Sequence, residues 1–353
     1  MNFKKELSDL VTILLNEGGS DLHLGEGRQP IIRLNGNLVP ISSNSVITKE
    51  YIYGILDEIL NVENKKRFID LKQTDFAYSY NHKERFRGNV YFQQGFIGIA
   101  LRHIPGNIKN LKELNLPPIL ESFTEKKQGF FLVVGPVGQG KSTTLASMIE
   151  LINQKRSEYI ITIEDPIEYV FKEKKSIIDQ REVRADTTDF HSGLKNVFRQ
   201  DANVVMLGEM RDNETISTAV TAAETGHLIF STLHTNSASR TIERIVDAFV
   251  PEQQNQIRLQ LAGSLTGIFS QRLVPKISGG QVPACELLIN TWAVANIIRE
   301  NRIHEIDMMI QTGSGLGMID LNTSLIELVR NGSISAETAY KYTNNVKTLE
   351  RLI

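Results

Sequence analysis

The stretch Gly135-Pro136-Val137-Gly138-Gln139-Gly140-Lys141-Ser142-Thr143 decides the fold of this 353-residue chain. An apolar run at 130–134 precedes it and a helical pattern at 144–152 follows it, so the local order is strand, glycine-rich turn, helix. The spacing G-x-x-x-x-G-K-S is that of a phosphate-binding loop. Glycines let backbone N–H groups surround an anion, and the helix N-terminus adds a favourable field.

This loop predicts a nucleotide site that uses magnesium. Lys141 can reach the β- and γ-phosphates, and the Ser142 hydroxyl is placed to ligate Mg²⁺. We therefore expect all of residues 135–143 to take part in nucleotide binding.

Composition is that of an ordinary soluble globular protein, with 41% hydrophobic and 23% charged residues. The length favours two domains. A net charge of −2 offers no general attraction for nucleic acid or anionic membrane, so neither is an expected partner. No apolar run approaches the ~20 residues that span a bilayer, and the N-terminus lacks a signal-peptide pattern. Because Cys285 is the single cysteine, a disulfide framework and a thiolate zinc site are excluded, and we expect a cytoplasmic protein.

Residues 1–104 predict a small α+β domain. Apolar residues at helical spacing alternate with segments of period two, and Asn35-Gly36 is a strong hairpin-turn signal. The expected helices cover 3–17, 49–60 and 63–71, and the expected strands lie at 20–24, 30–41, 75–80, 85–92 and 96–104. Proline and glycine residues then mark 105–118 as an interdomain linker.

Residues 119–353 have the pattern of a second, α/β domain. Short and continuously apolar runs alternate with helical patterns, which is typical of a parallel sheet covered on both faces. The runs lie at 130–134, 159–163, 204–207 and 228–233. From about 251 to 353 the pattern predicts C-terminal helices: a long helix over 252–274, a turn at 278–280, and helices over 291–300, 319–330 and 335–344.

Reactive side chains follow the predicted strands at the edge where parallel sheets bind ligands. Glu209 is our candidate for orienting the attacking water, and His234 our candidate γ-phosphate sensor. Glu164 and Asp165 are expected to hold Mg²⁺ waters or to support its outer shell, and the spacing does not decide whether either is a direct ligand.

Simpler roles exist for each of these residues. Glu209 could cap the next helix, and the two acids at 164–165 could form an ordinary turn before Pro166. His227 and His234 lack a third ligand for zinc, so we reject a zinc site and expect His227 at a domain contact. Two roles are possible for a group of arginines: they could lie on the solvent-exposed surface, or some could reach the nucleotide of a neighbouring subunit. These arginines are at 181, 184, 199, 211, 240 and 244.

With these residues in view, the chain resembles the secretion and pilus motor ATPases, specifically the type IV pilus retraction ATPases (the PilT type). The resemblance runs nearly end to end. It rests on an S-D-L-H-L segment at 20–24, a Walker A loop at 135–143, an Asp box at 161–168, a Walker B segment at 208–212 and a His box at 225–235.

The resemblance implies a PAS-like N-terminal domain, a RecA-like ATPase domain and a ring-shaped homohexamer. It implies ATP and Mg²⁺ as cofactors, with ATP bound between the two domains of a subunit. It further implies Glu209 as the catalytic glutamate, Glu164 as a supporting acid, and phosphate contacts from Arg85, Arg87 and Arg102.

Domain closure round the ring would, by this resemblance, turn the inner-membrane platform protein and return pilin to the membrane. The implied location is the cytoplasm, peripheral at the inner face of the cytoplasmic membrane and without insertion. A second retraction ATPase is a further implied partner.

The sequence departs from the family pattern at three places. Ala202-Asn203 replaces Pro-Asp before the Walker B strand, which we expect to remove a carboxylate near the site. Gly95 stands where many retraction ATPases carry an arginine, and Ala295 replaces an arginine in the segment 293–300.

These departures leave alternatives open: an accessory retraction ATPase, or a weakly hydrolysing regulatory paralogue. An extension or type II secretion ATPase would carry a four-cysteine zinc site. A nucleic-acid translocase would have basic character and stacking platforms. Both fit this chain less well.

Overall fold

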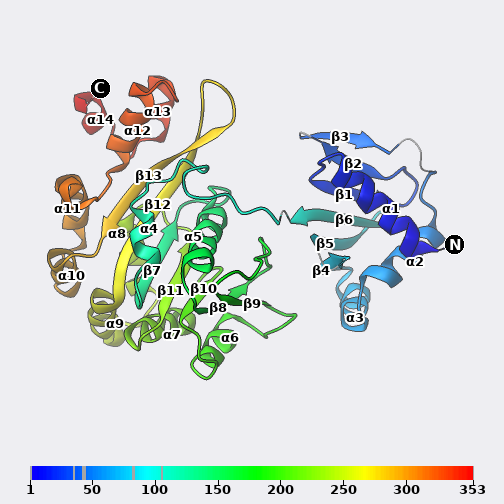
Figure 1. The fold of residues 1–353 in the computed structure, drawn as a ribbon, viewed down its shortest axis with the longest axis horizontal. Coiled ribbons are helices and arrows are strands. Elements are labelled where there is room, and N and C mark those ends of the chain that lie inside the picture. Colours follow the sequence, from blue (N-terminus) through cyan, green and yellow to red (C-terminus); the bar gives the residue numbers. More distant parts are fainter. Residues whose placement is uncertain (1, 35, 42–44, 82–83, 105, 353) are drawn as a thin grey trace. The chain divides into compact units, whose positions relative to one another are not determined.

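The computed structural model describes residues 2–34, 36–41, 45–81, 84–104 and 106–352. The chain divides into two compact units (Figure 1). The first comprises residues 1–107 with 168–170, and the second comprises 108–167 with 171–353. Among the described residues, no helix combines the length and the apolar character needed to cross a membrane.

The first unit is an antiparallel sheet with helices packed on it. The sheet order is β3-β2-β1-β6-β5-β4, formed by β1 (Asp21–Gly25), β2 (Ile31–Leu34), β3 (Asn37–Pro40), β4 (Gln73–Tyr80), β5 (Glu84–Gln93) and β6 (Phe96–Ile104). Its helices are α1 (Phe3–Asn16), α2 (Lys49–Ile59) and α3 (Val62–Leu71). Leu7, Leu10, Val11 and Leu14 recur at helical spacing, so α1 buries this stripe in the unit's core.

These elements agree with the strands and helices predicted for the N-terminal half. The strands β2 and β3 flank the predicted turn, where Gly36 has a φ of +87°, while Asn35 itself lies outside the described residues. Pro105 of the predicted linker also lies outside them.

The second unit is built on a mostly parallel sheet in the order β13-β12-β7-β11-β10-β8-β9, with β13 antiparallel to β12. Its strands are β7 (Gly129–Val134), β8 (Tyr159–Glu164), β9 (Ile177–Glu182), β10 (Val204–Leu207), β11 (Leu228–Leu233), β12 (Leu265–Pro275) and β13 (Gln281–Ile289). Its helices are α4 (Leu120–Thr124), α5 (Lys141–Lys155), α6 (Phe190–Val197), α7 (Asn213–Glu224), α8 (Ala238–Asp247), α9 (Pro251–Ser264), α10 (Trp292–Arg299), α11 (Ile306–Thr312), α12 (Leu321–Arg330), α13 (Ala336–Tyr342) and α14 (Val346–Leu352). Short 3₁₀ turns lie at Ile303–Glu305 and Ser314–Leu316.

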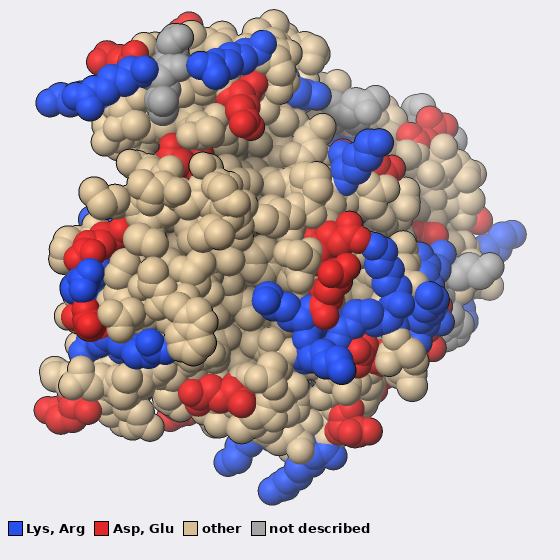
Figure 2. Space-filling view, turned by 60° about the vertical axis from the view of Figure 1, so that its left-hand side comes forward, with Lys and Arg blue, Asp and Glu red and all other residues tan. Residues whose placement is uncertain are grey.

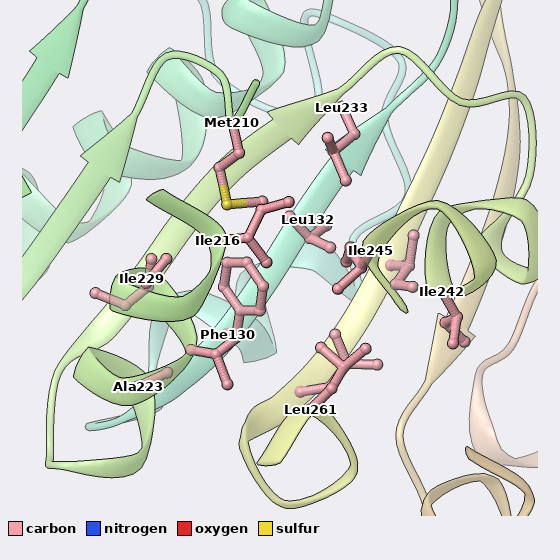
Figure 3. Close-up of a cluster of buried hydrophobic side chains, with 14 of the residues drawn as sticks. Phe130, Leu132, Met210, Ile216, Ala223, Ile229, Leu233, Ile242, Ile245 and Leu261 are labelled. Atoms are coloured by element: carbon pink, nitrogen blue, oxygen red, sulfur yellow. The ribbon is translucent and has the colours of Figure 1, made fainter. Parts of the chain in front are cut away.

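Helices cover both faces of this sheet, which is why its central strands are continuously apolar. Phe130 and Leu132 of β7 meet side chains of α7, α8 and α9 on one face, including Ile216, Ile245 and Leu261 (Figure 3). On the other face Phe131 packs against Phe123 of α4, with ring centroids 4.4 Å apart.

The prediction of one helix over 252–274 is wrong beyond Ser264. There α9 ends and β12 begins, pairing with β7 on one side and β13 on the other. A short apolar run fits a buried helix and a buried strand equally well, and only the backbone partners on both sides favour the strand. The turn at 278–280 therefore closes the β12–β13 hairpin, and the region from 251 is not purely helical. The strands β9 and β13 and the helix α14 also went unpredicted.

The C-terminal helices have a small core of their own. Leu325, Ile334 and Leu349 from α12 to α14 pack on Val274 and Ala284 of the β12–β13 hairpin. On the same hairpin Glu286 is only 7% exposed, and its Oε1 accepts the backbone N–H of Ala238 at 2.7 Å. Burial raises the pKa of this carboxyl to about 7, helped by the nearby charges of Asp307 and Asp320 and opposed by the Ala238 hydrogen bond and by Arg272.

Glu286 should make stability fall as pH rises through neutrality. Its pKa is about 7 in the folded chain against an ordinary value of 4.5, so the folded state binds the proton more tightly. The stabilisation is complete below pH 4.5 and is lost as pH rises through about 7. Thermal unfolding of wild type and Glu286→Gln across this range should show the wild type losing stability relative to the variant at higher pH. Parallel curves would contradict the assignment.

Candidate nucleotide-hydrolysis site

The phosphate loop connects β7 to α5 through three glycines with positive φ: Gly135 (+147°), Gly138 (+76°) and Gly140 (+78°). Residues that carry a Cβ rarely adopt such backbone angles, which explains why glycine occupies these three positions. At Gly135 a Cβ would also lie 2.4 Å from the carbonyl oxygen of Gln271. The loop is therefore held against β12 as well as between β7 and α5.

Lys141 is the first residue of α5 and is only 7% exposed. Its Nζ donates to the carbonyl oxygens of Gly135 and Pro136, both at 2.9 Å, and lies 3.3 Å from Nδ1 of His234. The ammonium group thus sits inside the loop, where it can face a bound phosphate. Ser142, next along the first turn of α5, is half-buried.

Glu209 follows β10, and His234 follows the neighbouring parallel strand β11. His234 Nε2 lies 3.0 Å from Glu209 Oε2, while Arg211 Nε donates to Glu209 Oε1 at 2.5 Å. Burial raises the pKa of Glu209, but the hydrogen bonds from Arg211 and His234 and their charges outweigh it and hold the pKa below its usual range. Lys141, His234 and Glu209 therefore form a continuous polar row beside the loop.

The two acids after β8 have different surroundings. Glu164 is 5% exposed, and its Oε1 accepts from Thr162 Oγ1 at 2.7 Å and from Gln180 Nε2 at 3.2 Å. Asp165 Oδ2 lies 3.3 Å from an Arg184 nitrogen and 3.8 Å from Arg211. Arg211 thus lies between Glu209 and Asp165 and offsets the charge of both.

The three predicted arginines lie in the first unit, on one face of its sheet. Arg85 and Arg87 are two residues apart on β5, and Arg102 on β6 stands directly opposite Arg87. Arg102 Nε donates to Oδ1 of Asp21 at 2.8 Å. Burial raises the pKa of Asp21, but hydrogen bonds from Ser20 and Arg102 outweigh this effect, so the pKa lies below its usual range. That Arg85, Arg87 and Arg102 contact phosphates stays a prediction.

Sequence reasoning missed Gln271, the residue that fastens β12 to the loop. Its Oε1 accepts from Thr144 Oγ1 at 2.7 Å, and its Nε2 donates to the carbonyl of Gln139. In return Gln139 Oε1 accepts the backbone N–H of Leu273 at 2.7 Å. The polar residues in the apolar run Leu265–Pro275 were the available signal, but it was hidden by the helix prediction.

The expectation that Asn203 replaces a carboxylate near the site is wrong. Asn203 precedes β10, at the amino end of the parallel strands, whereas the phosphate loop follows their carboxyl ends. Its Oδ1 accepts the backbone N–H of Tyr159 at 2.9 Å, so Asn203 links the beginning of β10 to the beginning of β8. Of the other departures, Gly95 lies in the β5–β6 turn with a φ of +85°, and Ala295 is buried on α10.

A parallel sheet with this loop, its lysine, and an acid and a histidine at adjacent strand ends defines a P-loop ATPase of the RecA-like class. Comparison with known proteins narrows the class. Residues 102–316 match the family model for type II/IV secretion system proteins.

The chain is 41% identical over 334 residues to the type IV pilus retraction ATPase PilT of Pseudomonas aeruginosa, covering 95% of this chain and 97% of the relative. It is 36% identical over 352 residues to the type IV pilus ATPase PilU of the same organism, covering 99% and 91%. A crystal structure of the pilus retraction motor PilT with bound ADP matches with a TM-score of 0.91 and 43% identity, over 97% of this chain and 98% of that one.

The chain belongs to the type II/IV secretion system protein family, and within it to the PilT-like retraction ATPases. The predicted fold class is confirmed: a PAS-like α+β N-terminal part, a RecA-like P-loop ATPase part and a helical C-terminal region.

Replacing Gln271 with alanine should weaken ADP binding about five- to thirtyfold, because two hydrogen bonds that hold the loop, each worth about 1 kcal/mol, are lost. Titration with a fluorescent ADP measures the affinity. The matched control is Gln281→Ala at the exposed start of β13. Equal affinity of Gln271→Ala and wild type would show that β12 does not support the loop.

Proposed function

We propose that this protein is a motor ATPase that hydrolyses ATP to power type IV pilus retraction, that is, pilin disassembly and twitching motility. The observation that carries the proposal is the row Lys141–His234–Glu209 beside the phosphate loop. Similarity to the PilT of P. aeruginosa over nearly the whole of both chains supports it.

In the proposed reaction the phosphates lie on the backbone N–H groups of 137–141, and Lys141 exchanges its carbonyl acceptors for the β- and γ-phosphates. His234, 3.3 Å from the lysine, is then within reach of the γ-phosphate. Glu209 orients the attacking water. Arg211 and His234 each bond one of its carboxylate oxygens, and each oxygen keeps a further lone pair that can accept from the water.

The proposal includes Mg²⁺ held by the nucleotide, Ser142 and Asp165, the last directly or through water. Hydroxyl and carboxylate oxygens are the donors that Mg²⁺ prefers. In the part of the chain that the structure describes, no cluster of three or more His, Cys, Asp or Glu could hold a metal by itself. That fits an ion bound through phosphates and one or two protein oxygens, where it would neutralise developing charge. Glu164, tied to Thr162 and Gln180, would support the site from the neighbouring position.

We further propose that 1–104 and 119–353 act as two domains joined by 105–118. Arg85, Arg87 and Arg102 would contribute positive charge to the phosphates, and the hydrogen bond from Arg102 to Asp21 would fix the orientation of that arginine. Six copies would form the working ring. The related PilT motor was crystallised with ADP, which supports ATP as the substrate here.

The partner best suited to this role is the platform protein at the base of the pilus in the inner membrane. The ATPase would then work in the cytoplasm, peripheral at the inner face of that membrane. A second retraction ATPase is a further proposed partner.

A second candidate is an accessory retraction ATPase of the PilU type, favoured by the match to PilU and by Ala295. A deletion strain that still twitches would support it. The regulatory alternative loses its main argument, because Asn203 lies away from the site. On the face drawn in Figure 2, acidic and basic side chains lie side by side, unlike the basic field of a nucleic-acid translocase.

Replacing Glu209 with glutamine should lower kcat at least about a hundredfold and leave ATP binding intact, because the oriented water is lost and the phosphate contacts remain. Steady-state phosphate release and fluorescent-nucleotide titration measure the two quantities. Asn203→Asp is the control, with kcat expected within about twofold of wild type. Absence of Mg²⁺-dependent hydrolysis in the wild type would overturn the proposed function.

Replacing Lys141 with alanine should weaken ATP binding about a hundredfold or more, since the loop loses the cation that faces the phosphates. Isothermal titration calorimetry of the intact chain measures this. Lys347→Ala, exposed on α14, serves as the control. Unchanged affinity in Lys141→Ala would refute the assignment of the phosphate loop.

A further inference from the structure

Three successive residues of β12 contact two different loops. Gln271 bonds to the phosphate loop, as described above. Its neighbours point the other way, as strand geometry requires. Ser270 Oγ and an Arg272 guanidinium nitrogen donate to the same carbonyl oxygen, that of Asn236, at 3.2 and 3.4 Å. Asn236 comes two residues after His234, so β12 holds the loop that carries the histidine.

The remaining hydrogen bonds of Arg272 reach the far end of the chain. It donates to the carbonyl oxygen of Tyr342 at 2.8 Å and to Oδ1 of Asn344 at 2.6 Å. Tyr342 is the last residue of α13, and Asn344 lies between α13 and α14. The segment 342–345 is itself fastened to Asn322 of α12, whose side chain bonds Thr343 Oγ1 and the carbonyl of Asn345. One half-buried guanidinium therefore joins the loop after β11 to the C-terminal helices.

A cavity of about 350 Å³ lies between the two segments that Arg272 joins. Asn236 and Ser237 line one side, and Asn344 and Asn345 line another. The two segments are thus separated by open space here, so a hydrogen-bonded side chain rather than close packing connects them. Glu286 also lines the cavity and accepts from Ala238, which fixes the distal end of the same loop.

We propose that Arg272 is a positioning residue through which the segment Tyr342–Asn345 sets the place of His234 and so the rate of ATP hydrolysis. The inference rests on the proposed function and adds its regulation. A partner that moves the C-terminal helices would change kcat without touching the nucleotide. Such an effect requires no change in the phosphate loop, because Arg272 and Gln271 leave β12 in opposite directions.

The kinetic test separates kcat from KM. Arg272→Gln should lower kcat about five- to twentyfold with KM within about twofold, because the loop of His234 loosens and Lys141 stays in place. Asn344→Ala should act in the same direction, and Arg272→Lys should restore part of the loss. In a His234→Ala background Arg272→Gln should cause no further loss, since both act through one group. Arg351→Gln on α14, which is exposed, is the matched control.

A second measurement does not depend on hydrolysis. Hydrogen–deuterium exchange in the intact chain should increase at residues 235–238 in Arg272→Gln and in Asn344→Ala, but not in Arg351→Gln. Unchanged exchange at residues 235–238 would overturn the inference and leave the proposed ATPase intact. The same holds if the double variant loses kcat by the product of the factors lost in Arg272→Gln and His234→Ala alone. A wild type that lacks ATPase activity would instead count against the proposed function, while the exchange result would still decide the coupling.

Discussion

The parallel pairing of β7 with β11 and with β12 is the constraint on which the rest of the site depends. Val134, the last residue of β7, pairs with Leu233 on one side and with Ser270 on the other. Gly135 therefore leaves the sheet level with His234 and Gln271. A shift of one residue in either pairing would turn those side chains to the opposite face. The register thus brings the phosphate loop, the histidine and the glutamine together.

Charge balance in the site follows from the same alignment. Strands β8 and β10 end side by side, so the acids that follow them, Asp165 and Glu209, would repel each other across a short distance. Arg211 lies between them and pairs with both. The hydrogen bonds and charges of Arg211 and His234 hold the pKa of Glu209 below its usual range, so this carboxylate is ionised at neutral pH. The same hydrogen bonds restrain the position of its side chain.

The sequence predicted a residue's place in the site only where that place depends on its near neighbours in the chain. The phosphate loop, its lysine and the strand-ending polar residues follow from patterns of a few residues, since glycine conformations and strand alternation are local properties. The β12–β13 hairpin was missed because its apolar run is equally compatible with a buried helix. Asn203 was misjudged because it precedes its strand, and in a parallel sheet that end lies opposite the edge where the phosphate loop and its polar partners meet.

The sequence by itself determined the class of the protein, through a glycine spacing typical of phosphate-binding loops and through motifs that resemble those of the pilus motor family. Tertiary structure decided which side chains touch. It placed Gln271 under the loop, Arg211 between two acids, and Arg272 between the loop of His234 and the chain's C-terminal helices. These partners are up to 132 residues apart in the sequence, as for Gln271 and Gln139. Such contacts depend on strand order and register, which hydrogen bonding between distant segments fixes and local propensity does not.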